Sequence, residues 1–176
     1  TPFVQANTGS LGMGISKAKG MALANRAAGV GRRIFVLAGD GGLQEGQLWE
    51  SPGSAANRGL AEIVAIVDHN KIQSDTWVDA VSRLGDVGAK FAAFGWHVAR
   101  CDGHDVAALE RTLRALDAVR DTPKVVIADT VKGKGVSFME GPAMKAGDLY
   151  GYHSGAPGEE PYTRGLGELL SAAEDL

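Results

Sequence analysis

The stretch from Gly39 to Ser74 reads GDGGLQEGQLWESPGSAANRGLAEIVAIVDHNKIQS. One apolar run (IFVLA, 34–38) leads directly into its first residues, and a second run inside it (IVAIVD, 63–68) leads into Asn70. Both runs are short and lack polar alternation, which predicts parallel strands buried on both faces. The residues between them, 47–57, have helical composition. The sequence therefore predicts a strand–loop–helix–strand unit and an α/β fold.

Two oxygen-bearing side chains follow these two predicted strands. In such a unit the carboxyl ends of neighbouring strands meet at one edge of the sheet, so Asp40 and Asn70 are expected side by side. Mg²⁺ prefers a few protein oxygens of this kind, together with water and phosphate oxygens. Gly39 and Gly41 leave the backbone N–H groups open to an anion, and a helix start nearby favours negative charge. The pattern predicts half of a small hard-cation site, next to backbone N–H groups that an anion can approach.

The spacing and the surrounding residues resemble a known family. GDG followed thirty positions after Asp40 by Asn70 resembles the binding motif of thiamine diphosphate enzymes. The segments GDG-x-LQEG-xx-WE and IVAIVDHNKIQSD resemble the transketolase branch in particular. The resemblance implies the N-terminal, diphosphate-binding domain of a transketolase. It also implies that family's fold, a three-layer α/β/α arrangement around a mostly parallel sheet.

The resemblance implies a specific cofactor site. In the family the Asp and Asn that match Asp40 and Asn70, with the backbone carbonyl matching Ile72, hold Mg²⁺, and the ion holds the diphosphate of thiamine diphosphate. The segment TGSLGMGISKAKGMALA (8–24) resembles another segment of transketolases, in which the residues matching Gly9 and Leu11 line the cofactor pocket. Met13 departs from the pattern, since the family usually has Gln there.

A histidine near the end of the chain is the expected catalytic residue. VKGKGVSFME (131–140) lacks the spacing of a P-loop but resembles a transketolase segment that leads to a histidine in a WHG-like motif. Here the loop reaches YHSGAP (152–157), and His153 is the match. The resemblance implies that His153 contacts the diphosphate and the substrate near the reacting carbon.

Other polar residues have competing interpretations. His69 adjoins Asn70, but neighbours on a strand point to opposite faces, so we expect a core or supporting role. Glu45 and Glu50 suit a solvated helix start, whereas the resemblance places the matching acids, around Trp49, at a dimer interface. The sequence DGHD (102–105) carries two carboxylates and an imidazole, yet a strand-to-helix turn capped by Asp105 explains it.

The remaining helices and strands are predicted from the spacing of apolar residues and from glycine and proline residues that end or precede an element. Gly95 terminates one predicted helix, and Pro123 precedes a predicted strand. We expect a helix with an apolar stripe starting at Ile15, a helix over 81–94, a strand over 96–101, a helix over 106–119, a strand over 124–130 and an amphipathic helix over 162–176.

Composition excludes several classes of protein. The 176 residues suit one domain with a substantial core, and the 25 glycines and 44% hydrophobic residues suit a glycine-loop α/β protein. With a net charge of −3, the sequence lacks the excess of basic residues that is typical of nucleic-acid-binding proteins. Cys101 is the only cysteine, so there is no intrachain disulfide. No apolar run approaches the ~20 residues needed to span a bilayer. We expect no membrane partner and a cytoplasmic location.

The resemblance extends from about residue 8 to 170 and covers only part of a transketolase. We expect a single diphosphate-binding domain over 1–176, without the family's upstream segment and without its pyrimidine-binding domain. The glutamate that activates the aminopyrimidine belongs to that second domain. The resemblance therefore implies a homo- or hetero-oligomer, active only with a second subunit or domain that carries the pyrimidine-binding part. The implied activity is transfer of a two-carbon ketol unit between sugars, or from a ketoacid donor.

Two other interpretations stay open. The first is a component of another thiamine diphosphate enzyme, similar to 1-deoxyxylulose-phosphate synthase or to a ketoacid dehydrogenase; LQEG and NKIQSD argue against it. The second is a non-catalytic assembly or regulatory module of the same fold. The presence of Asp40 and Asn70 argues against loss of the site.

Overall fold

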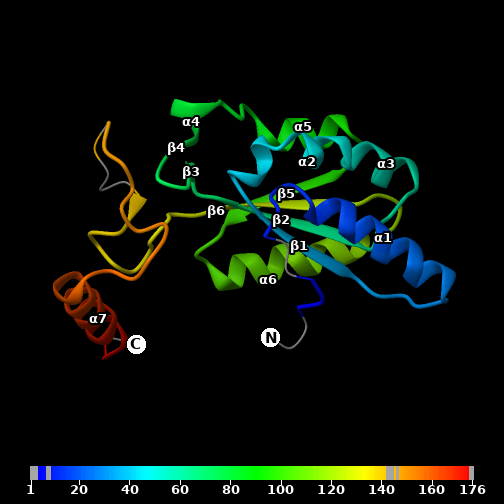
Figure 1. Cartoon of the computed structure of the whole chain (residues 1–176). Helices are drawn as coiled ribbons and strands as arrows, with labels where there is room; N and C mark the ends of the chain where they lie inside the picture. Colours follow the sequence, from blue (N-terminus) through cyan, green and yellow to red (C-terminus); the bar gives the residue numbers. More distant parts are fainter. Residues whose placement is uncertain (1–3, 7–8, 142–144, 146, 175–176) are drawn as a thin grey trace.

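A computed structural model describes residues 4–6, 9–141, 145 and 147–174 of the chain. Its centre is a four-stranded sheet in which every neighbouring pair is parallel (Figure 1). In spatial order the strands are β1 (Ile34–Gly39), β2 (Ile63–His69), β6 (Lys124–Asp129) and β5 (His97–Asp102). Parallel neighbours require crossover connections, here through helices. The predicted α/β class and strand–loop–helix–strand unit are confirmed.

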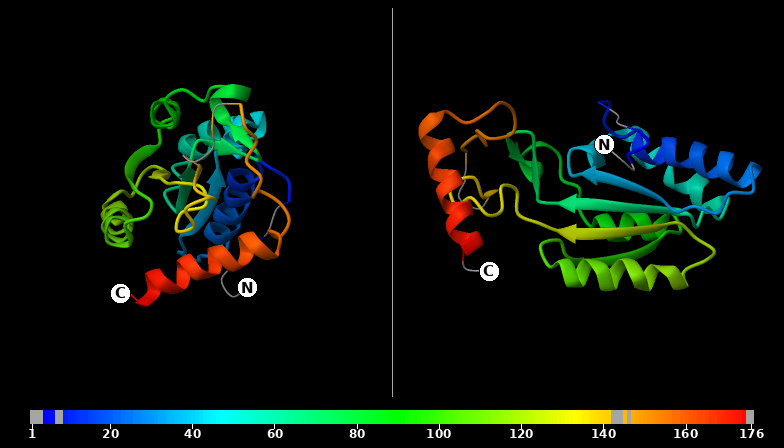
Figure 2. Two further views of the ribbon diagram at one scale, coloured as in Figure 1. Left: turned by 90° about the vertical axis from the view of Figure 1, so that its left-hand side faces the viewer. Right: turned by 90° about the horizontal axis from the view of Figure 1, so that it is seen from below.

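Helices cover the two faces of the sheet unequally, as Figures 1 and 2 show. On one face Ile15, Phe91 and Ile127 belong to the larger buried cluster, and on the other Val64, Leu116 and Val126 form a smaller one. The first face carries α1 (Gly14–Ala27), α2 (Gly46–Glu50), α3 (Pro52–Asn57) and α5 (Val87–Ala93); the second carries α6 (Val106–Ala115) and the short 3-10 turn η2 (Leu116–Ala118). The expected three-layer arrangement is confirmed.

The prediction that both central strands are buried on both faces is wrong for β1. Val36 packs under α1 and is 9% exposed, but Phe35 and Leu37 on the opposite face are 50% and 77% exposed. β1 is an edge strand, and the strand residues of the smaller cluster come from β2, β6 and β5 and not from β1. β2 and β6 lie in the middle of the sheet and are buried as expected.

Two predicted helices are each divided in the structure. The segment 47–57 forms α2 and α3, and the break falls before Pro52, which lacks an N–H to continue a helix but suits a first turn. The segment 81–94 contains the end of α4 (Val78–Val81), then extended residues, then α5. Gly85 has φ +62°, and the Asp86 carboxylate accepts a hydrogen bond from the N–H of Ala89 at 2.9 Å. A left-handed glycine and a helix cap require a new helix start.

The other helices agree more closely with expectation. Asp105 caps α6 by accepting a hydrogen bond from the N–H of Ala108 at 2.9 Å, as predicted. α7 (Glu159–Glu174) begins three residues earlier than expected, and Leu176, the predicted end, lies outside the described residues. This helix lies beyond the carboxyl ends of the strands (Figure 2). Within the described part of the chain, none of the helices combines the length and the apolar character that a bilayer crossing requires.

Truncation of one core aromatic tests the packing of the larger cluster. Phe91 is fully buried, with its ring centroid 5.1 Å from that of Trp49 and 5.3 Å from that of Trp96. Phe91→Ala should lower the free energy of unfolding by about 3–5 kcal/mol because it leaves a cavity that these rings cannot fill. Phe94→Ala is the matched control, since Phe94 is 37% exposed and should cost less than half as much. Equal losses in urea titrations would contradict this packing.

Candidate active site at the carboxyl edge of the sheet

Asp40 is a buried carboxylate at the carboxyl edge of the sheet. Gly39 pairs with Asp68 in the parallel register, so Asp40, the next residue, lies across from His69. The Asp40 side chain is 0% exposed; its Oδ1 lies 2.5 Å from His69 Nδ1, and its Oδ2 accepts a hydrogen bond from the backbone N–H of Lys71 at 2.6 Å. The last residue of β2 thus directs its ring at Asp40. His69 therefore has the supporting position that we expected.

Asn70 begins a tight turn directly after β2. Its side-chain Oδ1 accepts a hydrogen bond from the N–H of Ile72 at 3.0 Å, and Lys71 between them has φ +69°. Left-handed backbone is uncommon for residues other than glycine and marks places where the surrounding structure imposes it. The turn leads into a small hairpin of β3 (Ile72–Gln73) and β4 (Thr76–Trp77). Asp40, Asn70 and the start of this hairpin are thus held together.

The oxygen donors at this edge fit a magnesium ion. The carboxylate of Asp40, the amide oxygen of Asn70 and the carbonyl of Ile72 are all hard oxygen ligands, the kind that Mg²⁺ prefers. Each Asp40 oxygen and the Asn70 Oδ1 accept one bond here, and each carries a second lone pair. Among the described residues no group of three or more His, Cys, Asp or Glu is placed to hold a metal ion.

The glycines around Asp40 leave one side of the loop open. A Cβ added at Gly39 or at Gly42, the first residue of the 3-10 turn η1 (Gly42–Gln44), would meet nothing within 4 Å. A Cβ at Gly41 would lie 3.5 Å from the Cβ of Gln73, so the hairpin covers that side. An anion can approach the backbone N–H groups of such a loop closely. The loop fits the expected diphosphate site.

The loop that contains Gly9 and Leu11 lies next to this region. A Cβ at Gly12 in that loop would be only 2.7 Å from the Cβ of Glu45, which directly follows η1. A Cβ at Gly9 would have no neighbour within 4 Å, and Leu11 is 62% exposed. The two residues are therefore accessible, and their contact with a cofactor stays a prediction.

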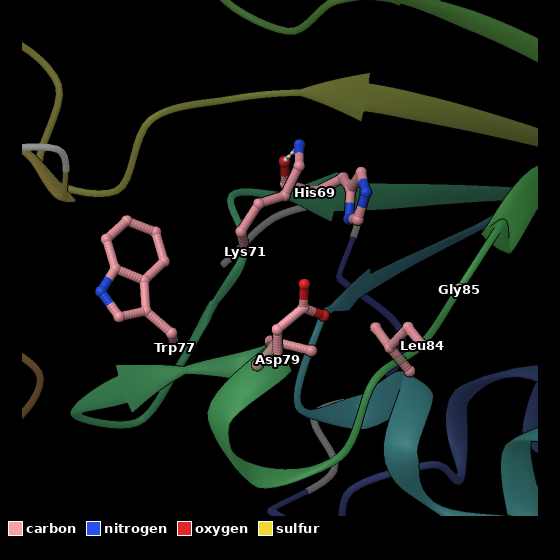
Figure 3. A pocket seen from close by; sticks show the side chains of 7 residues that line it. His69, Lys71, Trp77, Asp79, Leu84 and Gly85 are labelled. Atoms are coloured by element: carbon pink, nitrogen blue, oxygen red, sulfur yellow. Dashed lines mark hydrogen bonds between the residues drawn. The ribbon is translucent and has the colours of Figure 1, made fainter. Parts of the chain in front are cut away.

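A cavity of about 410 Å³ borders the Asp40–His69 pair. In Figure 3 the carboxylate of Asp79 points into the space that His69 also lines, while the side chain of Lys71 curls back so that its ammonium group meets the His69 carbonyl. Its lining comes from the end of β2, the hairpin and the turn before it, α4 and the segment after α4: His69, Lys71, Trp77, Val78, Asp79, Leu84 and Gly85. A volume of this order is in the range of small-molecule sites.

The segment that carries His153 is attached to the same hairpin. The N–H of Tyr150 donates to the carbonyl of Asp75 at 2.5 Å, and a Cβ at Gly141 would lie 2.6 Å from Cδ1 of Ile72. His153 is exposed, and its Nδ1 lies 3.3 Å from Nζ of Lys132. The tertiary structure thus brings the loop of His153 to the edge that carries Asp40, although residues 142–144 and 146 lie outside the described part.

The glycines of KGKG serve the turn of this segment. Gly133 has φ +79°, and a Cβ there would lie 2.0 Å from the carbonyl oxygen of Met139. Only glycine fits so close to a backbone group in this conformation. The backbone conformation therefore explains why residue 133 is glycine. This agrees with the absence of P-loop spacing in the sequence.

The two glutamates expected at a dimer interface lie on the surface, whereas Trp49 between them makes contacts within the domain. Glu45 and Glu50 are exposed. Trp49 donates from Nε1 to the carbonyl of Leu43 at 2.6 Å and packs against Phe91 within the chain. Trp49 is thus partly buried by contacts within the domain, and the interface role of this segment stays a prediction.

A charged network beside Asp40 was not predicted from the sequence. Asp129, at the end of β6, pairs with His69 in the strand register, and Arg100 donates to both of its oxygens at 2.6 and 2.8 Å. Lys71 adds an ion pair at 3.1 Å. These hydrogen bonds and charges, that from Arg100 above all, lower the pKa of Asp129 from 3.8 to about 2. A polar residue at the end of a third parallel strand was the available signal.

Replacement of Asp129 should make the free energy of unfolding depend less on pH in the acidic range. Because its folded pKa is depressed, Asp129 contributes stability that is present above about pH 4 and is lost as the pH falls toward about 2. Asp129→Asn should cost less than about 1 kcal/mol at pH 7, since the carboxylate is 37% exposed and partly screened. Urea titrations at pH 7, 5, 4 and 3 measure the difference in free energy of unfolding between the unaltered chain and Asp129→Asn. This difference should shrink below pH 4. A constant difference at every pH would contradict the assignment.

Comparisons with known proteins place these features in context. The sequence model described as "Transketolase, thiamine diphosphate binding domain" matches residues 1–153. A subunit of apulose-4-phosphate transketolase from Phocaeicola vulgatus is 34% identical over 175 residues, which are 99% of this chain and 60% of that protein. The 6-deoxy-6-sulfo-D-fructose transketolase subunit SqwG of a Clostridium species is 40% identical over 145 residues, covering 80% of this chain and 51% of that protein. The chain thus spans between half and two thirds of the length of these relatives.

Solved structures show the same arrangement. The crystal structure of transketolase from Campylobacter jejuni aligns with a TM-score of 0.74 at 29% identity, over 93% of this chain and 26% of that one. A transketolase variant from Pichia stipitis aligns with a TM-score of 0.73 at 25% identity, over 99% of this chain and 29% of that one. The similarity therefore covers nearly all of this chain and about a quarter of each of those chains.

Proposed function

Because this chain belongs to the family of the transketolase thiamine diphosphate binding domain, we propose that it is one subunit or part of a transketolase-like transferase. In this proposal it holds the Mg²⁺–diphosphate end of the cofactor. The observation that supports it most is the buried Asp40 carboxylate, bound by His69 and by the N–H of Lys71. Such a group, next to Asn70 at the joint edge of two parallel strands, suits a cation bound to an anionic ligand.

Each residue of the site has a stated task in this proposal. Asp40, Asn70 and the carbonyl of Ile72 hold Mg²⁺. The backbone of Gly39 and Gly41 receives the diphosphate, while Gly9 and Leu11 line the pocket of the cofactor. When bound, thiamine diphosphate supplies the carbon nucleophile needed to break and form carbon–carbon bonds, and the protein supplies binding and orientation.

The surrounding residues orient the metal ligand. The ring of His69 and the N–H of Lys71 each bind one oxygen of Asp40, so the carboxylate is held in one orientation. Fixed ligands of this kind are ready for the ion without reorganisation. Lys71 keeps its own position by donating from Nζ to the carbonyl of His69 at 2.9 Å.

His153 is the proposed catalytic residue of this chain. We assign it hydrogen bonding to the diphosphate or to the substrate near the reacting carbon. Support comes from its exposure, from the attachment of its segment to the hairpin through Tyr150 and Asp75, and from the neighbouring Lys132. The ammonium group of Lys132 adds positive charge where an anionic substrate or cofactor would lie.

The active enzyme in this proposal requires a second polypeptide or domain. Two relatives are named as transketolase subunits, and the chain spans between half and two thirds of their length. In the proposal, that second polypeptide or domain carries the pyrimidine-binding part, and the active enzyme is a homo- or hetero-oligomer. The names of those relatives refer to apulose-4-phosphate and to 6-deoxy-6-sulfo-D-fructose. We accordingly propose transfer of a two-carbon ketol unit from a sugar donor to an aldose.

Calorimetric titration of thiamine diphosphate tests the binding half of the proposal. The chain should bind the cofactor with Mg²⁺ and lose most of that affinity in a chelator. Asp40→Asn should abolish the dependence on Mg²⁺, because an amide replaces the carboxylate ligand. Asp105→Asn is the matched control: Asn caps helices as well as Asp does, and Asp105 lies at the start of α6. It should bind like the unaltered chain.

Other outcomes separate the competing functions. Binding that ignores both Mg²⁺ and Asp40 would refute the metal site. In the presence of a polypeptide that carries the pyrimidine-binding domain, turnover of a ketoacid but not of a ketose donor would instead indicate another class of thiamine diphosphate enzyme. Cofactor and partner binding without any transfer would indicate a non-catalytic module.

A further inference from the structure

Gln73 lies against the loop of Asp40. It is the second residue of β3, directly after Ile72, and neighbouring residues of a strand point to opposite sides. The side chain of Ile72 faces Gly141, so that of Gln73 points the other way, and its Cβ lies 3.5 Å from the position of a Cβ on Gly41. Gln73 is therefore next to both a predicted backbone ligand of the ion and the predicted diphosphate loop.

The amide oxygen of Gln73 is buried without a partner. Of the buried side-chain oxygen and nitrogen atoms in the described residues, this oxygen lacks a hydrogen bond in the structure. By contrast, His69 and Lys71 bind the two oxygens of Asp40, and the N–H of Ile72 binds Oδ1 of Asn70. A buried acceptor without a donor destabilises a protein, and such exceptions in a native structure call for a specific explanation.

A magnesium ion at Asp40 would supply the missing donor. Mg²⁺ prefers six oxygen ligands; Asp40, Asn70 and the carbonyl of Ile72 would supply three, and phosphate oxygens and water would supply the others. Carboxylate, amide, carbonyl and phosphate oxygens in this shell only accept hydrogen bonds. Water is the one ligand that carries hydrogen atoms. We propose that Gln73 accepts a hydrogen bond from a water bound to the ion, and is thereby a further positioning residue of the cofactor site; this rests on the function proposed above.

The proposal predicts opposite effects of one substitution on stability and on binding. Gln73→Met preserves the length of the side chain and removes the oxygen. The cofactor-free chain should become more stable, with a rise in Tm of about 2–6 °C, because a buried unpaired acceptor is lost. The Mg²⁺-dependent affinity for thiamine diphosphate should fall about tenfold, since the bound water loses its acceptor. Thermal unfolding and calorimetric titration measure the two effects.

Gln47→Met is the matched control. Gln47 is a partly buried glutamine that is already paired, since its Nε2 donates to Oγ of Ser16 at 2.6 Å. Its replacement should lower the Tm and leave the affinity for thiamine diphosphate unchanged. The two variants should thus shift the Tm in opposite directions, and only Gln73→Met should weaken binding.

Each remaining outcome overturns a defined part of the proposal. Unchanged affinity in Gln73→Met would refute the contact, and a fall in both Tm and affinity would show a merely structural role. Equal weakening with and without Mg²⁺ would exclude water on the ion as the partner. In the unaltered chain, Mn²⁺ bound with thiamine diphosphate should enhance the relaxation of water protons, and its failure to do so would also refute the proposal. Absence of Mg²⁺-dependent binding by the unaltered chain would refute the proposed function itself.

Discussion

A buried carboxylate organises the carboxyl edge of the sheet in this domain. Transfer of the Asp40 side chain out of water is costly unless its oxygens are bound, and the structure provides the ring of His69 and the N–H of Lys71. The first partner requires the parallel register of β1 and β2, which places His69 opposite Asp40. The second requires the left-handed conformation of Lys71. The need to bind one side chain thus constrains both the pairing of two strands and the turn that follows the second.

The charged side chains at this edge come from several neighbouring strands and the turns that follow them. Asp129 pairs with His69 in the register and would add a second carboxylate, but Arg100 and Lys71 bind it. Lys71 therefore has two functions, since its N–H serves Asp40 and its ammonium group serves Asp129. In the described part of the chain, the buried amide oxygen of Gln73 has no such partner. Unpaired groups of this kind are expected where a ligand completes the structure.

The hairpin after β2 connects the two halves of the proposed site. One side of it contacts Gly41 through Gln73, while Ile72 contacts Gly141 in the segment that leads to His153. The N–H of Tyr150 is bound to Asp75 at the tip. A hairpin of four paired residues thus joins segments about a hundred positions apart in the sequence, which explains how a loop with few buried residues reaches the edge of the sheet.

The sequence by itself determined the features that depend on neighbouring residues. It predicted the parallel strands, the cap at Asp105, the family and its three-layer fold, and the edge shared by Asp40 and Asn70, because apolar runs, turn residues and motif spacing are local. Only the tertiary structure decided which faces are covered. Phe35 and Leu37 are exposed because β1 is an edge strand, a property of strand order that no single strand encodes. The pairing of Asp40 with His69, the binding of Asp129 by Arg100 and the unpaired oxygen of Gln73 arise in the same way, because each depends on register and packing between segments far apart in the chain.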